Sequence, residues 1–257
     1  MEPYNQKLVY STNHNRTLVI MAKAPRPGLV KTRLAPSLST LAVTALYRCL
    51  LEDTVALAKS LTGVEVAVIC PESDKAELAL LLGDSVRVVA QTGQGLAEGL
   101  VSVFAQFTAP RPPEGTGVEH SGVKVNPQRV IAFNSDSPHL SPSVLENAFQ
   151  ALATCDLVVG PTYDGGYYLV GAKVAHPTLF ENDGMGTSSA LERLLARAQA
   201  LQLSSALTEP FYDIDVVEDL IRLAPELTLA PARAPRTAAW LAELGKSIKQ
   251  SSGKAEQ

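Results

Sequence analysis

The stretch TLVIMAKAPRPGLVKTRL, residues 17–34, decides the fold class of this chain. Its first five residues are apolar and partly β-branched, and they predict a buried strand over 17–21. The following residues break regular structure with two prolines and a glycine, and they carry four cations: Lys23, Arg26, Lys31 and Arg33. In open α/β sheets, a loop at the carboxyl end of a buried strand is where phosphorylated ligands bind. The stretch therefore predicts an α/β fold with a phosphate-binding loop after its first strand.

Charge is unevenly distributed along the chain. Residues 3–51 contain no Asp or Glu and seven Lys or Arg, whereas the whole chain has a net charge of −4. A positive N-terminal region thus lies on an acidic body. Duplex binding normally needs an extended cationic face, and no further basic run follows the loop, so we expect no nucleic-acid partner.

Composition and motifs exclude several protein classes. With 46% hydrophobic and 19% charged residues over 257 positions, the chain is ordinary for a folded domain with a sizeable core. No apolar run approaches the ~20 residues that span a bilayer, and the polar segment 1–16 does not resemble a signal peptide. We therefore expect a cytoplasmic protein without membrane insertion. The GxxxxGK[ST] and GxGxxG motifs are absent, which argues against a Walker-type ATPase or a nicotinamide enzyme. Three widely spaced cysteines without a ligand pattern predict buried free thiols.

Short apolar runs alternate with longer helical patterns, which predicts βαβ units and a Rossmann-like, mostly parallel sheet flanked by helices. After the first strand, further strands are predicted over 64–70, 86–90, 129–133 and 156–159, with an extended segment over 206–214. Helices are predicted over 39–60, 74–82, 96–107, 143–153 and 187–203, with another beginning at 215–220. We expect a polar tail over 1–16, one domain over 17–223 with a Pro/Gly-rich surface loop at 109–128, and an extension over 224–257 with one helix near 237–248 and a polar end.

Three aspartates follow predicted strands and are candidate metal ligands. Asp136 lies in a turn after the strand 129–133, where a carboxylate can hold Mg²⁺ next to a phosphate, although a lone Asp in a turn is often only a turn residue or helix cap. Asp213 and Asp215 offer a second pair just before a helix. We expect one of them to be the second metal ligand and the other to cap the helix.

The sequence GPTYDGGYYLVG, residues 160–171, predicts a hairpin or bend at its Asp-Gly-Gly turn. Asp164 there could contact a ribose or an acceptor, because Gly165 and Gly166 permit close approach of a ligand to the backbone. The plainer interpretation is a type I′ turn. His139 is expected to be structural, since no Ser or Cys nucleophile motif accompanies it.

These motifs occur together in a known family. MAKAPRPGLVKTRLAP, NSDSPHL, GPTYDGGYYLVG and YDIDVVEDL, in this order between about residues 17 and 223, resemble the bacterial glycosyltransferase-like family of the nucleotide-diphospho-sugar transferase (GT-A) superfamily. They resemble 2-phospholactate guanylyltransferase more distantly. The resemblance implies a single GT-A domain, a nucleotide bound over the first strands, and a divalent metal, Mg²⁺ or Mn²⁺, held by the aspartate of DSPHL.

Motifs and resemblance together predict the site residues. Catalytic roles are expected for Lys23, Lys31, Arg33 and Asp136. Nucleotide contacts are expected from Met21, Ala22, Lys23, Ala24, Gly28, Lys31, Arg33, Gln91, Gly93 and Ser135. Acceptor contacts are expected from Asp164, Gly165, Gly166 and Tyr167. Metal ligands are expected at Asp136, Asp215 and Asp213.

Two enzyme classes and one binding class remain open. Glycosyltransferases of this fold usually carry Asp-x-Asp at the metal, whereas Asn134 stands first here and leaves Asp136 alone, as in cytidylyl- and guanylyltransferases. This favours transfer of a nucleotidyl group from a nucleoside triphosphate to a small phosphate or phosphonate acceptor. The alternatives are a glycosyltransferase that uses a nucleoside diphosphate sugar, and a non-catalytic nucleotide-binding protein. A homodimer is compatible with the sequence, which names neither the base nor the acceptor.

Overall fold

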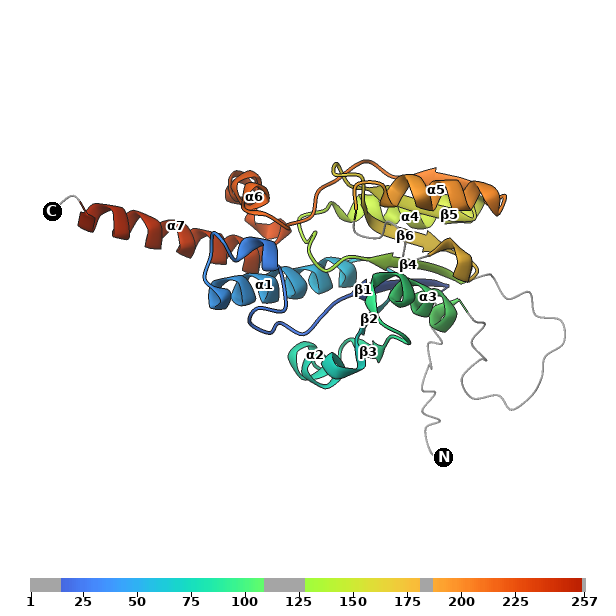
Figure 1. The fold of residues 1–257 in the computed structure, drawn as a ribbon, viewed down its shortest axis with the longest axis horizontal. Helices are drawn as coiled ribbons and strands as arrows, with labels where there is room; N and C mark the ends of the chain where they lie inside the picture. Colours follow the sequence, from blue (N-terminus) through green and yellow to red (C-terminus); the bar gives the residue numbers. More distant parts are fainter. Residues whose placement is uncertain (1–14, 109–127, 181–186, 256–257) are drawn as a thin grey trace, which may run out of the picture.

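The computed structural model of this chain describes residues 15–108, 128–180 and 187–255. Most of the predicted N-terminal tail (1–16) and of the predicted Pro/Gly-rich loop (109–128) lies outside these ranges. The described residues form one sheet with helices on both faces and two further helices at one end (Figure 1). This is the predicted α/β, Rossmann-like architecture.

The sheet has seven strands among the described residues, in the order β3-β2-β1-β4-β6-β5-β7. Their bounds are β1 Arg16–Met21, β2 Glu65–Cys70, β3 Arg87–Ala90, β4 Arg129–Phe133, β5 Leu157–Pro161, β6 Tyr167–Ala172 and β7 Ser205–Leu207. Strand β6 pairs antiparallel with both neighbours, while all other pairings are parallel. The sheet is therefore mostly parallel, as predicted.

Helices cover both faces of the sheet. Their bounds are α1 Thr40–Lys59, α2 Lys75–Leu82, α3 Gly95–Phe107, α4 Pro142–Thr154, α5 Ala190–Ala200, α6 Val217–Leu229 and α7 Pro235–Ala255. Residues of α1, α2 and α4 share one apolar core with the sheet, and α3 and α5 share a second core on the opposite face. A third core joins α6 and α7 to the outer side of α1, so that α7 extends from that end of the molecule in Figure 1.

Strand β1 shows why the central strands are continuous apolar runs. Leu18 and Ile20 belong to the core under α1, α2 and α4, whereas Val19 between them belongs to the core under α3 and α5. All three side chains are fully buried. Because helices cover both faces of β1, its residues do not alternate between apolar and polar. The resulting continuous apolar run made this strand easy to predict from the sequence.

The C-terminal part differs from the prediction in its details. Helix α6 continues through Pro225 to Leu229, because Leu220, Leu223 and Leu227 bury their side chains against α1 and α7. It thereby crosses the predicted boundary between residues 223 and 224; the division of the chain into three parts remains a prediction. The predicted extended segment 206–214 forms only the short strand β7, and α7 is longer than the predicted helix 237–248.

Two composition-based expectations can be compared with the structure. All three cysteines are free thiols, and Cys70 is buried, but Cys49 and Cys155 are partly exposed, so the prediction of burial is wrong for these two. In the described part of the chain, every helix is too short or too polar to cross a membrane.

The strand order places the candidate site. Strands β1, β2, β3 and β4 are parallel, so their carboxyl ends meet at one edge of the sheet. From β1 the chain first adds strands on one side and later β4 on the other, which makes the crevice between β1 and β4 a topological switch point. Open α/β sheets bind ligands at such a point. The start of β6 lies beside it, because β6 runs antiparallel to β4.

Candidate active site

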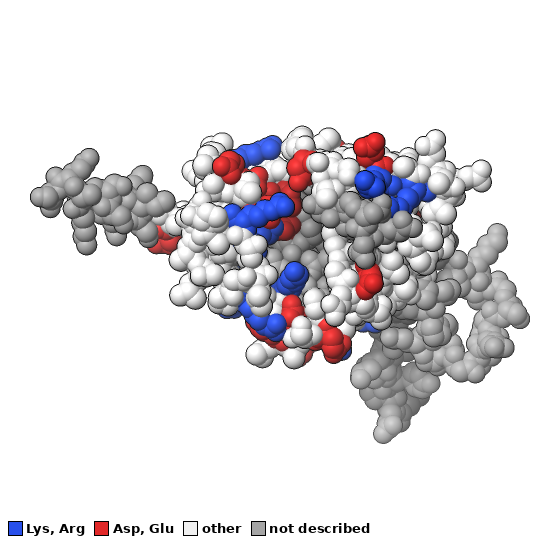
Figure 2. All heavy atoms as spheres, in the orientation of Figure 1, with Lys and Arg blue, Asp and Glu red and all other residues white. Residues whose placement is uncertain are grey.

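A cavity of about 1210 Å³ opens at this edge of the sheet. Basic and acidic side chains gather around the central hollow in Figure 2. The lining includes residues from the ends of β1, β2, β3 and β4, from the β5–β6 turn, and from the segment before α6. All predicted site residues line it except Ala24, Gly28 and Gly165. The structure thus brings the predicted residues together, while their individual roles remain predictions.

The loop after β1 has a fixed shape. Gly28 adopts a left-handed backbone with φ 76°, which glycine accommodates without strain, and Lys31 adopts one with φ 45°, which is uncommon for a residue with a side chain. Directly after Lys31, a 3₁₀ turn over Thr32–Leu34 inserts Leu34 into the core beneath α1 and α6. The buried leucine anchors the loop, and the left-handed lysine turns its side chain inward.

Arg26 does not join the other cations of this loop. Its guanidinium pairs with Asp74 at 2.8 Å and with Glu77 at 2.8 Å, and it donates to the carbonyl of Ser73 at 2.9 Å. Asp74 also accepts a hydrogen bond from the amide of Ala24 at 2.9 Å. Arg26, for which the sequence analysis assigned no site role, instead ties the loop after β1 to acidic residues of the β2–α2 segment.

Lys31 lies among the predicted metal ligands. Its ammonium donates to Asp136 Oδ2 and lies 3.5 Å from Asp215 Oδ1, and only 8% of its side chain is exposed. Burial alone would lower the pKa of Lys31, but the charges of Asp136 and Asp215 outweigh it and raise the pKa above its usual value. Arg33 pairs with the other oxygen of Asp215 at 2.6 Å. Two predicted phosphate ligands therefore neutralise the carboxylates.

The carboxylate cluster contains oxygen atoms that make no hydrogen bond to the described residues. Asp136 Oδ1 and Asn134 Oδ1 are buried and have no hydrogen-bond partner among the described residues. Desolvation, followed by the nearby charge of Asp136, raises the pKa of Asp213 to about 7. Oxygen atoms without hydrogen-bond partners and closely spaced carboxylates are suitable ligands for a hard divalent cation such as Mg²⁺ or Mn²⁺. Within the residues that can be described, no three His, Cys, Asp or Glu side chains already converge as a metal site.

The cap of α6 comes from a residue that the sequence did not single out. Asp219 Oδ2 accepts hydrogen bonds from the amides of Asp215 and Val216, both at 2.8 Å. Neither Asp213 nor Asp215 caps this helix, so that prediction is wrong: a carboxylate three residues inside the helix reaches back to its start. Both aspartates line the cavity instead. The amide of Ile214, between them, donates to the carbonyl of Asp136 at 3.1 Å and joins the two acidic segments.

Hydrogen bonds from its own side chains fix the shape of the loop after β3. Gln91 Nε2 donates to the carbonyls of Gly93 and Gly95, both at 3.2 Å, and Glu98 accepts from the amide of Gln94. A Cβ at Gly93 would approach Glu98 Oε2 to 2.1 Å, so this position requires glycine for packing as well as for its φ of 79°. The side-chain amide of Gln91 thus fixes the shape of this loop in the cavity wall.

The β5–β6 turn lines the same cavity as the basic loop. It is a hairpin, as predicted, but Asp164 has no positive φ, so it is not a type I′ turn, which needs two such residues. Asp164 Oδ1 accepts from Thr162 Oγ1 and from the amide of Gly166. A Cβ at Gly165 would approach the carbonyl oxygen of Ser188 to 2.0 Å. Packing against the segment before α5, rather than approach of a ligand, therefore requires this glycine.

Sequence reasoning missed Tyr47. Its ring is 4% exposed and lines the cavity, and its hydroxyl accepts from the amide of Lys23 at 3.0 Å and lies 3.2 Å from Ser135 Oγ. The only signal in the sequence is a tyrosine on the buried face of the helix pattern. Leu29 and Leu96, exposed at 62% and 48%, also line the cavity and were missed.

His139 lies outside this cavity. It is fully buried, and its ring centroid lies 4.8 Å from that of Phe211 and 4.5 Å from that of Tyr212. Within the described ranges, neither ring nitrogen has a hydrogen-bond partner. Burial, then the charges of Arg233 and Arg222, lower the pKa of His139 to about 3. The imidazole is therefore neutral at physiological pH.

The chain belongs to the family described as "Uncharacterized protein conserved in bacteria (DUF2064)", whose model matches residues 54–187, just over half of the chain. The match includes β4 with Asp136 and the β5–β6 turn. No curated protein sequence matches the chain significantly.

Solved structures share the fold. A proposed nucleotide-diphospho-sugar transferase from Desulfovibrio desulfuricans G20 superposes with a TM-score of 0.78 at 24% identity, covering 92% of this chain and 97% of that one. A nucleotidyl transferase from Methanothermobacter thermautotrophicus has a TM-score of 0.52 at 17% identity, covering 84% and 99%. The 4-diphosphocytidyl-2C-methyl-D-erythritol synthase from Anaerococcus prevotii has 0.50 at 13%, covering 84% and 98%. The predicted GT-A-like fold is confirmed.

Proposed function

We propose that this member of the DUF2064 family is a metal-dependent nucleotidyltransferase. It transfers a nucleoside monophosphate from a nucleoside triphosphate to a small acceptor that carries a phosphate or phosphonate, and it releases pyrophosphate. One observation carries the proposal: Lys31 and Arg33 lie in one cavity with Asp136, which keeps a buried oxygen without a partner. A triphosphate could bind Lys31 and Arg33, and its divalent cation could bind the carboxylates that the two cations would then release.

The positive side of the cavity matches a polyphosphate. Lys23, Lys31 and Arg33 all come from one loop at the carboxyl end of β1 and line the cavity together. Arg33 offers a planar fork for two phosphate oxygens, and the lysines are mobile point charges. We assign Lys31 and Arg33 to the β and γ phosphates and Lys23 to the oxygens of the α phosphate.

Binding of the nucleotide would exchange ionic partners. Without it, Lys31 and Arg33 neutralise Asp136 and Asp215, so neither side of the cluster is left as an isolated buried charge. When phosphates draw the two cations away, Asp136, Asp215 and Asp213 are free to act as oxygen ligands. A divalent cation held by these carboxylates would neutralise the charge that develops on the transferred phosphoryl group and on pyrophosphate.

The chemical step is an in-line displacement at the α phosphorus. An anionic oxygen of the acceptor forms the new bond to phosphorus as the bond to the bridging oxygen of pyrophosphate breaks, and pyrophosphate leaves with that electron pair. No general base is needed, because the acceptor already carries its negative charge. Lys23, Lys31 and Arg33 then contribute by positioning and by electrostatic stabilisation, as in other phosphoryl transfers.

The acceptor would occupy the side of the cavity formed by the β5–β6 turn. Asp164, Gly166 and Tyr167 line that side, and a cavity of about 1210 Å³ has room for a nucleotide and a second small molecule. Leu29 and Leu96 add exposed apolar surface to the lining, which suits the carbon skeleton of an acceptor or the face of a base.

A glycosyltransferase that uses a nucleoside diphosphate sugar is the second candidate. The fold shared with the Desulfovibrio protein, a proposed nucleotide-diphospho-sugar transferase, supports it at the level of architecture. Asn134 in place of a first aspartate before Asp136 favours nucleotidyl transfer, because only one carboxylate remains in that turn.

A panel of thermal-shift measurements separates the candidates. The purified protein is heated with each nucleoside triphosphate and with nucleoside diphosphate sugars, in Mg²⁺ and in EDTA. Nucleotidyl transfer predicts that a triphosphate with Mg²⁺ raises the melting temperature most, since a ligand stabilises the state that it binds. Stabilisation by a sugar nucleotide alone would instead support glycosyl transfer. Binding of a triphosphate without pyrophosphate release, across a panel of phosphate and phosphonate acceptors, would contradict the enzymatic proposal.

A further inference from the structure

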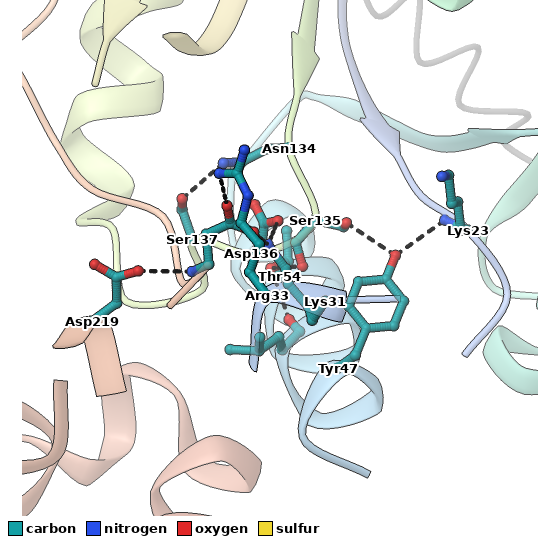
Figure 3. Close-up of polar contacts among 12 residues, drawn as sticks. Lys23, Lys31, Arg33, Tyr47, Thr54, Asn134, Ser135, Asp136, Ser137 and Asp219 are labelled. Atoms are coloured by element: carbon teal, nitrogen blue, oxygen red, sulfur yellow. Dashed lines mark hydrogen bonds and ion pairs between the residues drawn. The ribbon is translucent and has the colours of Figure 1, made fainter. Parts of the chain in front are cut away.

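Tyr47 links the two loops on which the proposed site depends. Its hydroxyl accepts a hydrogen bond from the backbone amide of Lys23, in the loop after β1, at 3.0 Å. The same hydroxyl lies 3.2 Å from Oγ of Ser135, next to Asp136 in the loop after β4. Figure 3 shows the chain of contacts from Lys23 through Tyr47 to Ser135. One phenol therefore joins the predicted phosphate loop to the predicted metal loop.

Helix α1 gives this link a rigid base. Thr54 follows Tyr47 by seven residues, which is two helical turns, so both side chains lie on one face of the helix. Thr54 Oγ1 lies 2.8 Å from the carbonyl of Leu50, within the helix, and 3.2 Å from the carbonyl of Ser135. Ser135 is thus held by α1 at both its side chain and its backbone, and it is itself buried.

The buried phenol of Tyr47 is neutral in the folded protein. The Tyr47 hydroxyl accepts from the amide of Lys23, and either hydroxyl can donate in its contact with Ser135. Burial raises the pKa of Tyr47, which keeps the phenol proton in place. A phenylalanine would fill the same space without either hydrogen bond.

We propose that Tyr47 is a positioning residue that fixes the distance between the phosphate loop at Lys23 and the metal loop at Asp136. Tyr47 acts through the amide of Lys23 and through Ser135, without a required contact to the reacting atoms. The inference rests on the proposed function, because it assigns the two loops to a nucleotide and to its metal. Its consequence is that metal and nucleotide assist each other's binding only while the two loops are held together.

The first arm of the test uses the protein without ligands. Amide hydrogen exchange is measured by NMR in the wild type, in Tyr47→Phe and in Tyr212→Phe. Tyr212 is the matched control, since its hydroxyl donates to Glu226 Oε1 in α6 at 2.9 Å and bonds to neither loop. Tyr47→Phe should speed exchange at the Lys23 amide and at residues 134–137 by roughly tenfold, the scale of one lost hydrogen bond, whereas Tyr212→Phe should not. Unchanged exchange in either loop would overturn the proposal.

The second arm measures binding of each nucleoside triphosphate by calorimetry, with and without Mg²⁺. The quantity compared is the factor by which Mg²⁺ tightens nucleotide binding. Tyr47→Phe should lower this factor by roughly tenfold and change the affinity in EDTA much less, a split that a general loss of stability would not produce. In a double-mutant cycle, Ser135→Ala should lower the factor as well, and the double variant should add little to either single change. Equal loss with and without Mg²⁺, or fully additive effects, would contradict the positioning role.

The two arms separate this proposal from the proposed function. If the wild-type protein binds no triphosphate, the nucleotidyltransferase proposal fails, and the exchange measurement still decides whether Tyr47 couples the loops. If the wild type binds a triphosphate with Mg²⁺ and Tyr47→Phe behaves like Tyr212→Phe in both arms, the proposed function stands and the role of Tyr47 is refuted.

Discussion

Two aspartates of this molecule, the buried Asp53 and the partly buried Asp136, are partnered in opposite ways. Asp53 is 1% exposed, and its oxygens accept from the amide and hydroxyl of Thr237, at 2.8 and 2.9 Å, and from the amide and guanidinium of Arg236, at 3.3 and 3.4 Å. Asp136 has one oxygen bonded to Lys31, and its other oxygen is buried without a partner. Both carboxylates are negative groups inside the fold, but only the first is satisfied by the fold itself.

The difference indicates what each residue is for. Asp53 joins α1 to the first turn of α7, so its hydrogen bonds stabilise the packing of that helix. Asp136 lines the cavity at the carboxyl edge of the sheet, where an unsatisfied oxygen can meet a ligand. A buried polar atom left without a partner costs about 1 to 3 kcal/mol, so a fold that retains one beside a cavity invites a functional explanation.

The largest expected effect is on catalysis at Asp136. Asp136→Asn removes the charge and preserves the shape, so we expect pyrophosphate release to fall at least about 100-fold, the scale for loss of one electrostatic contact to a transition state. The fold should survive this change, because Asp215 still pairs with the Lys31 ammonium when Asp136 loses its charge. The measurement is release of pyrophosphate from the triphosphate that stabilises the wild type. Undiminished release in Asp136→Asn would remove the metal role.

Asp53 should show the opposite pattern. Asp53→Ala leaves the amide of Thr237 and its neighbours without their acceptor, and we expect a loss of about 2 kcal/mol in the free energy of unfolding in urea. Affinity for the nucleotide should stay within about twofold of the wild type, since Asp53 does not line the cavity. A variant of Asp53 that unfolds normally but loses nucleotide binding would break the distinction between the two aspartates.

Lys31 sharpens the comparison because, in the proposed mechanism, it leaves Asp136 when the triphosphate binds. Lys31→Gln removes a positive charge from the carboxylate cluster, so Mn²⁺ alone should bind more tightly, on the order of tenfold, while the triphosphate binds more weakly. Free Mn²⁺ is measured by electron paramagnetic resonance. Lys23→Gln is the matched control: it should weaken triphosphate binding and leave the affinity for Mn²⁺ alone unchanged. Weaker Mn²⁺ binding in Lys31→Gln would contradict the exchange of partners.

The smallest expected effect is on the stability of His139 variants. The ring nitrogens of His139 also lack partners among the described residues, but the ring packs against aromatic rings and not against the cavity, so an unpartnered atom alone does not mark a ligand site. The pKa of His139 in the folded protein is about 3, against about 6.5 when unfolded, so the unfolded chain binds a proton that the folded chain excludes. Stability is therefore full above pH 6.5 and falls as the pH decreases toward 3, by about 1 kcal/mol between pH 6.5 and 5.5. Urea unfolding of the wild type and His139→Phe at these two pH values measures the difference. If the free energy of unfolding changed equally with pH in both proteins, the low pKa assigned to His139 would be refuted.

The fold was predictable because its central strands are buried on both faces. Such strands appear in the sequence as continuous apolar runs, and the strand 129–133 was predicted with its observed bounds. Helix α6 was harder, because Pro225 suggests an end to the helix. Burial of Leu223 and Leu227 against other helices outweighs that local signal.

The candidate site was predictable in its members more than in their pairings. Motifs named Lys31, Asp136 and Asp215, which meet in one cavity although 105 residues separate the first two. The sequence could not show that Arg26 forms an ion pair with Asp74, 48 residues away, because the identity of a basic residue does not indicate which acidic residue the fold places beside it. Tyr47 was missed for a related reason: its hydroxyl acquires a role only when the fold places two loops around it.

The most direct test of the account is the Mg²⁺ dependence of triphosphate binding in the wild type and in Asp136→Asn, measured by calorimetry. The account predicts that Mg²⁺ tightens binding to the wild type, and that this effect is lost in Asp136→Asn while weaker, metal-independent binding to the basic loop remains. The same enhancement by Mg²⁺ in both proteins would show that Asp136 does not take part in binding the metal, and it would contradict the central claim.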